Sequence, residues 1–204
     1  MTIYTFATDV GVTPTTQTWE LVANTKVFQS PLSNTIQTVQ RKGSYWKTTA
    51  TFNNLTGADR AKMQAFLAKL NGQTHRMYFT DYGYSKSGNA PIGDSAVLRV
   101  NGAGQTGSSL VADGATLNTT GYLKAGDYVA FNNQFHIVTA DCETVGGAIT
   151  ISIAPPLRKS PDDDDQINFI TPLAVMMVTS TASWDTRPGR VSNFTIEAIE
   201  DLLA

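Results

Sequence analysis

The chain has 204 residues, of which 41% are hydrophobic and 16% charged, and its formal net charge is −2. That content supports one sizeable core or two small ones, and so small a charge gives no field that would attract nucleic acid or an anionic membrane. The single cysteine, Cys142, excludes an internal disulfide and lacks companions for a tetrahedral metal site. We therefore expect a protein held by packing, with no cofactor and no specific nucleic-acid partner.

The N-terminus has no basic start followed by an apolar run. No window of the sequence approaches the roughly twenty apolar residues of a membrane span. These features predict a soluble protein that is made in the cytoplasm and does not insert into a membrane.

The first eighteen residues are rich in threonine and include Gly11 and Pro14, which predicts a strand or arm followed by a loop. Residues 19–22 are the next strand candidate. A turn at residues 24–25 then leads to a second extended segment, which Pro31 interrupts.

A polar strand is predicted next, at residues 35–41. It consists of Thr35, Ile36, Gln37, Thr38, Val39, Gln40 and Arg41. Such a strand can bury little on either face, so it would suit a sheet edge or a contact with another subunit. An ordinary solvated hairpin explains the same composition, because polar edge strands also keep monomers from sticking. Both interpretations stay open at this point.

Residues 43–81 predict a strand, a helix and a second strand, and we expect the remaining chain to be organised around them. The first strand alternates, because four side chains fall on one side of an extended chain: Trp46, Thr48, Ala50 and Phe52. Thr56 is a candidate N-cap for a helix over residues 57–70. Its apolar stripe has the spacing i, i+3, i+4 and i+7, at Met63, Phe66, Leu67 and Leu70. Asn71 then ends the helix in a left-handed turn, and residues 76–79 resume extended chain.

The composition changes after residue 81. Residues 82–94 are rich in Gly, Ser, Asn and Pro and form a candidate boundary. Short apolar runs separated by turns then predict a small β-barrel-like module over residues 95–171. Hairpin turns are indicated by Asn132-Asn133 and by Gly146-Gly147.

Apolar strands return at residues 174–179 and 191–199. We predict a mainly β fold, in which residues 1–90 and 172–204 form a β-sandwich or barrel with the helix packed on its sheet. The module is inserted between them, and this first domain is expected to fold without it because closing the loop costs little. Its expected core residues are Trp19, Trp46, Phe52, Met63, Phe66, Leu67, Leu70, Phe194 and Ile196.

Charge divides the chain in the same way. Residues 96–171 carry eight acidic and four basic side chains, a net −4, so the remainder is +2 in a chain of −2. The positive excess lies in residues 26–76. A solvated face explains this distribution as well as a binding surface does.

Apparent chemical motifs do not form a convincing active site. Residues 102–107 match GxGxxG but precede no helix that could hold a pyrophosphate, and the aspartate run 162–165 lacks the spacing of a calcium loop. His75 and His136 stand in no ligand spacing. Carboxylates beside Cys142 should disfavour its thiolate. We expect no enzyme.

Short patterns in the first half of the chain carry a family resemblance, which returns near residues 190–197. They are Trp19-Glu20-Leu21, Asn24-Thr25, Phe28-x-Ser30-Pro31-Leu32, Gln37-Thr38, Arg41-x-Gly43, Trp46, Leu55-Thr56-Gly57, Gln64-Ala65-Phe66-Leu67 and Arg190-Val191-Ser192. The chain resembles the distal tail proteins of long-tailed, siphovirus-like bacteriophages. The resemblance implies a structural protein of the virion tail, made in the host bacterial cytoplasm. It would form a ring, usually of six copies, that joins the tail tube to the hub proteins of the tail tip or baseplate.

Two functions compete on this basis. A ring subunit would bind its neighbours through heterologous surfaces, and the expected contributors are the polar strand 35–41 and the N-terminal arm. The alternative is a tail module that binds host-surface saccharide through exposed aromatic side chains such as Tyr122, Tyr128 and Phe135. Aromatic side chains in a small barrel are more often buried in the core than exposed for stacking on a sugar. This favours the ring subunit over the saccharide-binding module.

Overall fold

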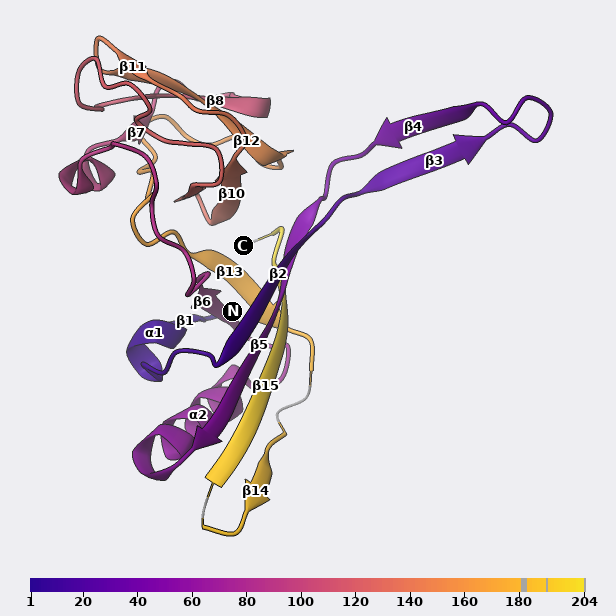
Figure 1. Ribbon diagram of the computed structural model, residues 1–204, viewed down its shortest axis with the longest axis vertical. Coiled ribbons are helices and arrows are strands. Elements are labelled where there is room, and N and C mark those ends of the chain that lie inside the picture. Colours follow the sequence, from indigo (N-terminus) through magenta and orange to yellow (C-terminus); the bar gives the residue numbers. More distant parts are fainter. Residues whose placement is uncertain (181–182, 190, 204) are drawn as a thin grey trace.

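The computed structural model in Figure 1 describes residues 1–180, 183–189 and 191–203. It confirms the predicted fold class: the chain is mainly β, with several sheets and one main helix packed on a sheet. Of the patterns that carry the family resemblance, Arg190 lies outside the described residues, as do residues 181–182 and 204 of the predicted first domain. None of the described helices is long and apolar enough to cross a membrane.

The larger sheet has seven strands, and both ends of the chain contribute to it. In sheet order they are β1 (Ile3–Thr5), β6 (Arg76–Phe79), β13 (Ala174–Val178), β15 (Val191–Glu200), β5 (Tyr45–Leu55) and β2 (Thr16–Val22), with β14 (Asp185–Arg187) paired to β15. The pair β1–β6 is parallel and the others are antiparallel. Strands far apart in the sequence therefore lie side by side at its centre.

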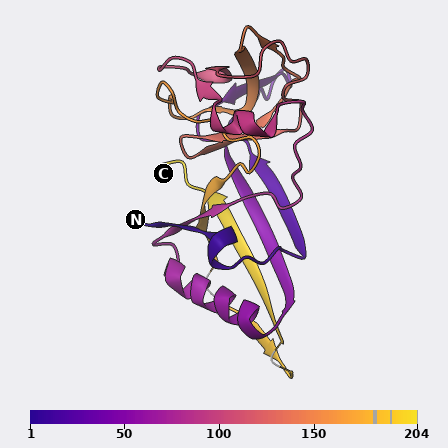
Figure 2. The ribbon, with the colours of Figure 1, turned by 90° about the vertical axis from the view of Figure 1, so that its left-hand side faces the viewer.

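Helix α2 (Gly57–Leu70) covers one face of this sheet, as Figure 2 shows. The four predicted stripe residues are all buried, and Asn71 ends the helix with a φ of 49°, in the left-handed region. The predicted cap is only partly right: Thr56 is the N-cap residue, but its side chain makes no capping hydrogen bond.

The N-terminal segment is not a free arm. After β1, the short helix α1 (Phe6–Asp9) places the Phe6 ring in the core, where it packs edge-on against Phe66 and Phe79 at centroid distances of 5.2 and 5.1 Å. Phe6 is fully buried and Val10 nearly so. The sequence predicted an arm that contributes to a subunit contact, whereas two apolar side chains anchor this segment within its own chain.

The predicted core residues of the first domain lie in one cluster with Phe6. Eight of the nine are buried, and Trp19 is half-buried against the same cluster.

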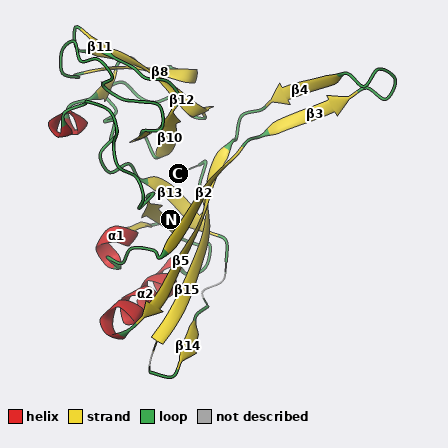
Figure 3. Ribbon diagram, viewed as in Figure 1, coloured by secondary structure: helices red, strands yellow, loops and turns green. Residues whose placement is uncertain are grey.

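The second sheet has six strands, and it lies at the upper left of Figure 3, where β8, β10, β11 and β12 are labelled. They run in the order β7 (Arg99–Val100), β8 (Gly107–Asp113), β12 (Ala148–Leu157), β10 (Gln134–Val138) and β9 (Tyr128–Phe131), with β11 (Thr144–Val145) paired to β12; the 3-10 helix η1 (Ile92–Ala96) precedes them. Asn132 and Asn133 form the β9–β10 turn with φ values of 45° and 57°. Both predicted hairpin signals thus sit at turns, since Gly146 and Gly147 join β11 to β12.

The two sheets share apolar contacts. Phe135 and Ala130 of the second sheet belong to the core cluster of the first, and Tyr128 and Ile137 pack against it. Replacing residues 96–171 by a linker would therefore remove side chains from the first core as well as close a loop.

The remaining strands, β3 (Thr25–Gln29) and β4 (Ile36–Gln40), pair only with each other among the described residues. Figure 1 shows this hairpin extending away from both sheets.

Candidate assembly interface

The β3–β4 hairpin, which we call the arm, is exposed in both strands. All ten of its strand residues are exposed. Large apolar side chains of the strands and of the turn between them have exposed fractions from 47% to 98%: Val27, Phe28, Leu32, Ile36 and Val39. A single two-stranded hairpin is marginally stable in water, so these side chains lack the burial that a folded strand pair normally needs.

The pairing register distributes the apolar side chains over both faces of the arm. Lys26 pairs with Val39, and Phe28 pairs with Gln37, so these four share one face. The Lys26 ammonium lies 5.1 Å from the centre of the Phe28 ring, which agrees with that assignment. The other face carries Val27 and Ile36 with polar neighbours. Since apolar groups occur on both sides, either face could receive a partner.

The arm is also purely basic. Between Glu20 and Asp59 the sequence contains no acidic residue, whereas Lys26, Arg41 and Lys42 lie on the arm or at its root. None of these three cations belongs to an ion pair among the described residues. A partner surface with carboxylates would match this charge.

Local hydrogen bonds fix the root of the arm. The Asn24 amide N–H donates to Ser44 Oγ at 3.1 Å, and Asn24 Nδ2 donates to the Lys42 carbonyl at 2.7 Å. Gly43 has a φ of 101°, in the region that favours glycine. These contacts hold the two strands together where they leave the sheet, so the direction of the arm is set by the sheet.

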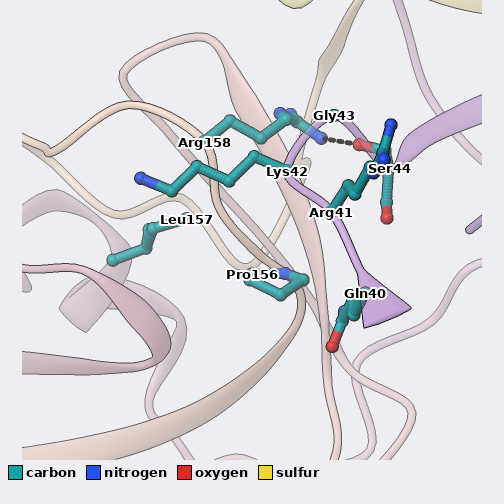
Figure 4. A pocket seen from close by; sticks show the side chains of 8 residues that line it. All are labelled: Gln40, Arg41, Lys42, Gly43, Ser44, Pro156, Leu157 and Arg158. Carbon is teal, nitrogen blue, oxygen red and sulfur yellow. Dashed lines mark hydrogen bonds between the residues drawn. The ribbon is translucent and has the colours of Figure 1, made fainter. Parts of the chain in front are cut away.

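A small cavity of about 150 Å³ separates the arm root from the end of β12. Figure 4 shows its lining: Gln40, Arg41, Lys42, Gly43 and Ser44 from the root, and Pro156, Leu157 and Arg158 from the second sheet. Arg158 Nη1 donates to the Ser44 carbonyl at 3.2 Å, the dashed line of the figure. The root is thereby tied to the second sheet as well.

The same arginine enters a buried ion pair, which we call the joint. The Glu200 carboxylate, at the end of β15, accepts hydrogen bonds from both terminal nitrogens of Arg158. It also accepts the backbone N–H groups of Trp46 at 3.1 Å and Phe135 at 3.2 Å. Burial raises the pKa of Glu200, and Arg158 with the two amides opposes that rise.

Aromatic rings enclose the joint. The Trp46 indole N–H donates to the Phe135 carbonyl at 2.9 Å. Trp19 and Tyr128 stack on the Phe135 ring, with centroid distances of 5.3 and 4.9 Å. The second sheet is therefore locked to the first by polar bonds within an apolar shell.

The predicted interface residues all lie on the arm or at its root. Thr35 is in the turn before β4, β4 itself holds Ile36, Gln37, Thr38, Val39 and Gln40, and Arg41 follows it; all seven are exposed. Sequence reasoning did not include the partner strand β3 in this set, although Val27 and Phe28 are its largest apolar groups. Adjacent apolar residues without alternation, in a stretch lacking acids, are the signal that could have identified it.

The aromatic residues considered as a saccharide platform are not on the surface. Tyr122 and Phe135 are fully buried, and Tyr128 is half-buried against the core. They cannot form an exposed stacking surface in this conformation.

The other chemical candidates remain scattered. Burial raises the pKa of the Cys142 thiol, and the carboxylates of Asp127 and Asp141 add to the rise. Within the described ranges, no three His, Cys, Asp or Glu side chains gather to hold a metal ion. Residues 102–106 lie in the connection between β7 and β8, in which the Gly102 N–H donates to Asp163, and Gly107 begins β8.

No protein-family model matches this chain, and no curated protein sequence does.

Proposed function

We propose that this protein is an assembly subunit, which forms a homo-oligomeric ring between the tail tube and the tail-tip hub of a long-tailed bacteriophage. The ring and its place in the virion rest on the sequence resemblance, which also suggests six copies. The physical support comes from the arm.

The observation that carries the proposal is an exposed hairpin with apolar side chains on both faces. Moving a large apolar side chain from full exposure to full burial contributes about 1.5 to 3 kcal/mol, and each of Val27, Phe28, Leu32, Ile36 and Val39 would gain the part that corresponds to its exposed fraction. In the isolated chain these side chains remain in water, so this free energy of burial becomes available only when a protein partner covers them. The joint and the root fix the direction in which the arm leaves the sheet, so a partner would order only the strand pair itself, and the apolar burial would offset that cost.

A ring requires each copy to present two different surfaces to its neighbours. Pairing of an arm with a different surface on the next copy is a heterologous contact, and repeated heterologous contacts close into a ring when the rotation permits. The predicted saccharide module has less support, since its three aromatic side chains lie in the cores.

The test is an arm variant, Ile36→Asp with Val39→Asp, which places one carboxylate on each face. Wild-type protein should form rings, measured by light scattering and electron microscopy, and the variant should remain a folded monomer. Phage that carry the variant should yield tailless or tip-deficient particles. The matched control is Lys62→Asp, on the solvent-exposed face of α2, and this variant should assemble normally.

Normal assembly by the arm variant would overturn the proposal. So would a purified wild-type protein that stays monomeric, or one that degrades cell-wall or capsule polymer.

A further inference from the structure

The outer face of the second sheet carries an unpartnered apolar strip. Val111 of β8 pairs with Thr150 of β12, and Val145 of β11 pairs with Ala148, so these four side chains share one face. All four are exposed, Val111 by 39% and Val145 by 69%. The strip crosses three neighbouring strands.

A groove of about 390 Å³ follows this strip, and its rim is acidic. Asp141 and Glu143 line it, and no basic side chain does among the described residues. One Asp141 oxygen accepts the Ala125 N–H at 2.9 Å, and no ion pair in the described part of the chain includes either carboxylate. Lys124 lines the adjoining hollow with them, so the site keeps a net negative charge.

The arm has the complementary properties. Its Lys26 face presents one cation together with Phe28 and Val39, and the arm and root contain no acid. An apolar strip with a carboxylate rim would bury the two apolar side chains and place Lys26 near Glu143 or Asp141. Such charge complementarity also fixes which face of the arm docks.

A chain cannot fill its own groove in this conformation. In Figure 1 the arm leaves the molecule at the right, whereas β11 lies at the upper left. Strand β3 has five residues, so this part of the arm extends about 17 Å at 3.3 Å per residue. The arm therefore reaches outward, away from the groove of its own chain.

We propose that the Lys26 face of the arm docks in the groove formed by Val111, Val145, Asp141 and Glu143 on the next copy of this chain. The inference rests on the proposed ring and specifies its contact as arm to inserted module. Each subunit then donates one arm and accepts another, which is the head-to-tail pattern that a closed ring requires.

The test mixes two full-length variants that each lack one half of the contact. The arm variant carries Lys26→Glu and Phe28→Ala, and the groove variant carries Val111→Glu and Val145→Glu. Each alone should stay monomeric where wild type forms rings, since the first loses the cation and the aromatic ring of the arm and the second loses the apolar strip. Mixed, they retain one intact arm and one intact groove. The altered arm and the altered groove are both acidic and repel each other, so sedimentation should show a 1:1 heterodimer and nothing larger.

Three further substitutions in the heterodimer sharpen the result. Lys26→Glu alone should weaken the heterodimer at least about tenfold, and Glu143→Lys in its acceptor should restore it. Ile36→Asp lies on the opposite face of the arm and should leave heterodimer affinity unchanged. A stronger effect of Ile36→Asp than of Lys26→Glu would overturn the assignment of the face.

The outcomes separate this inference from the function on which it rests. If wild type forms rings but the mixture stays monomeric, arm-to-groove docking is wrong and the ring stands. If wild type remains monomeric at every concentration, both fall. Circular dichroism melts of each variant show that the monomers are folded.

Discussion

The arm and the joint handle polar and apolar groups in opposite ways. At the joint a carboxylate and a guanidinium are buried, and the carboxylate accepts four hydrogen bonds from three residues. On the arm, large apolar side chains are exposed and pack on no sheet of the described chain. The joint is formed entirely by residues of one chain. The arm leaves its apolar side chains exposed, which is why we propose that assembly occurs through it.

The largest difference is expected when the ion pair at the joint is broken. Arg158→Ala should destabilise the fold by about 3 to 5 kcal/mol, because it leaves the Glu200 carboxylate buried without its counter-charge. Arg187→Ala is the matched control, since its ion pair with Asp185 is more than 60% exposed and should contribute less than about 1 kcal/mol. Denaturant unfolding of the monomers measures both changes. Equal effects would mean that the buried pair does not hold the sheets together.

The same comparison can be made with phenylalanine. Phe135→Ala should cost about 3 to 5 kcal/mol, because it opens a cavity between the stacked rings of Trp19 and Tyr128. Phe28→Ala, on the arm, should change monomer stability by less than about 0.5 kcal/mol, because that ring is 47% exposed. Thermal melts of the two variants give the comparison. A large loss of monomer stability from Phe28→Ala would show that the arm packs on its own chain.

Lowering the pH should reduce the free energy of unfolding through His136 in the second sheet. The strands of the arm carry no acidic side chain and no histidine, so their pairing should not change. His136 is fully buried next to the joint, and burial lowers its pKa from 6.5 to about 3. The unfolded chain therefore binds a proton that the folded chain does not. Stability is complete above about pH 6.5 and falls toward pH 3 by up to about 1.4 kcal/mol per pH unit.

The measurement is unfolding free energy against pH for wild type and His136→Leu. Between about pH 3 and 6.5, the unfolding free energy of the variant should depend less on pH than that of wild type. The other titrating groups are the same in both proteins, so the difference between the two slopes reports on His136. An unchanged slope would mean that His136 is protonated or solvated in the folded protein.

The sequence predicted what local pattern controls. Alternation in β5, the stripe of α2 and the turns at Asn132 and Gly146 each follow from neighbouring residues, and the structure has them. The joint could not be predicted, because Arg158 and Glu200 meet only through the packing of two sheets.

Burial of the N-terminal segment was missed for the same reason. Phe6 is placed by a parallel pairing of β1 with β6, more than seventy residues later, which leaves no trace in the local sequence. For the candidate interface, the strand 35–41 was recognisable from its polarity. This strand extends outward together with β3 because the hairpin packs on neither sheet. A local sequence pattern does not reveal whether a hairpin packs on the rest of the chain.

Amide hydrogen exchange of the arm tests the central claim most directly. In a folded monomer, such as Ile36→Asp with Val39→Asp, amides of Thr25–Gln29 and Ile36–Gln40 should exchange fast, because an isolated strand pair opens readily. In assembled wild type they should become protected, whereas β10 amides at the joint should be protected in both. Arm amides that stay fast in the ring, or are already slow in the monomer, would contradict assembly through the arm.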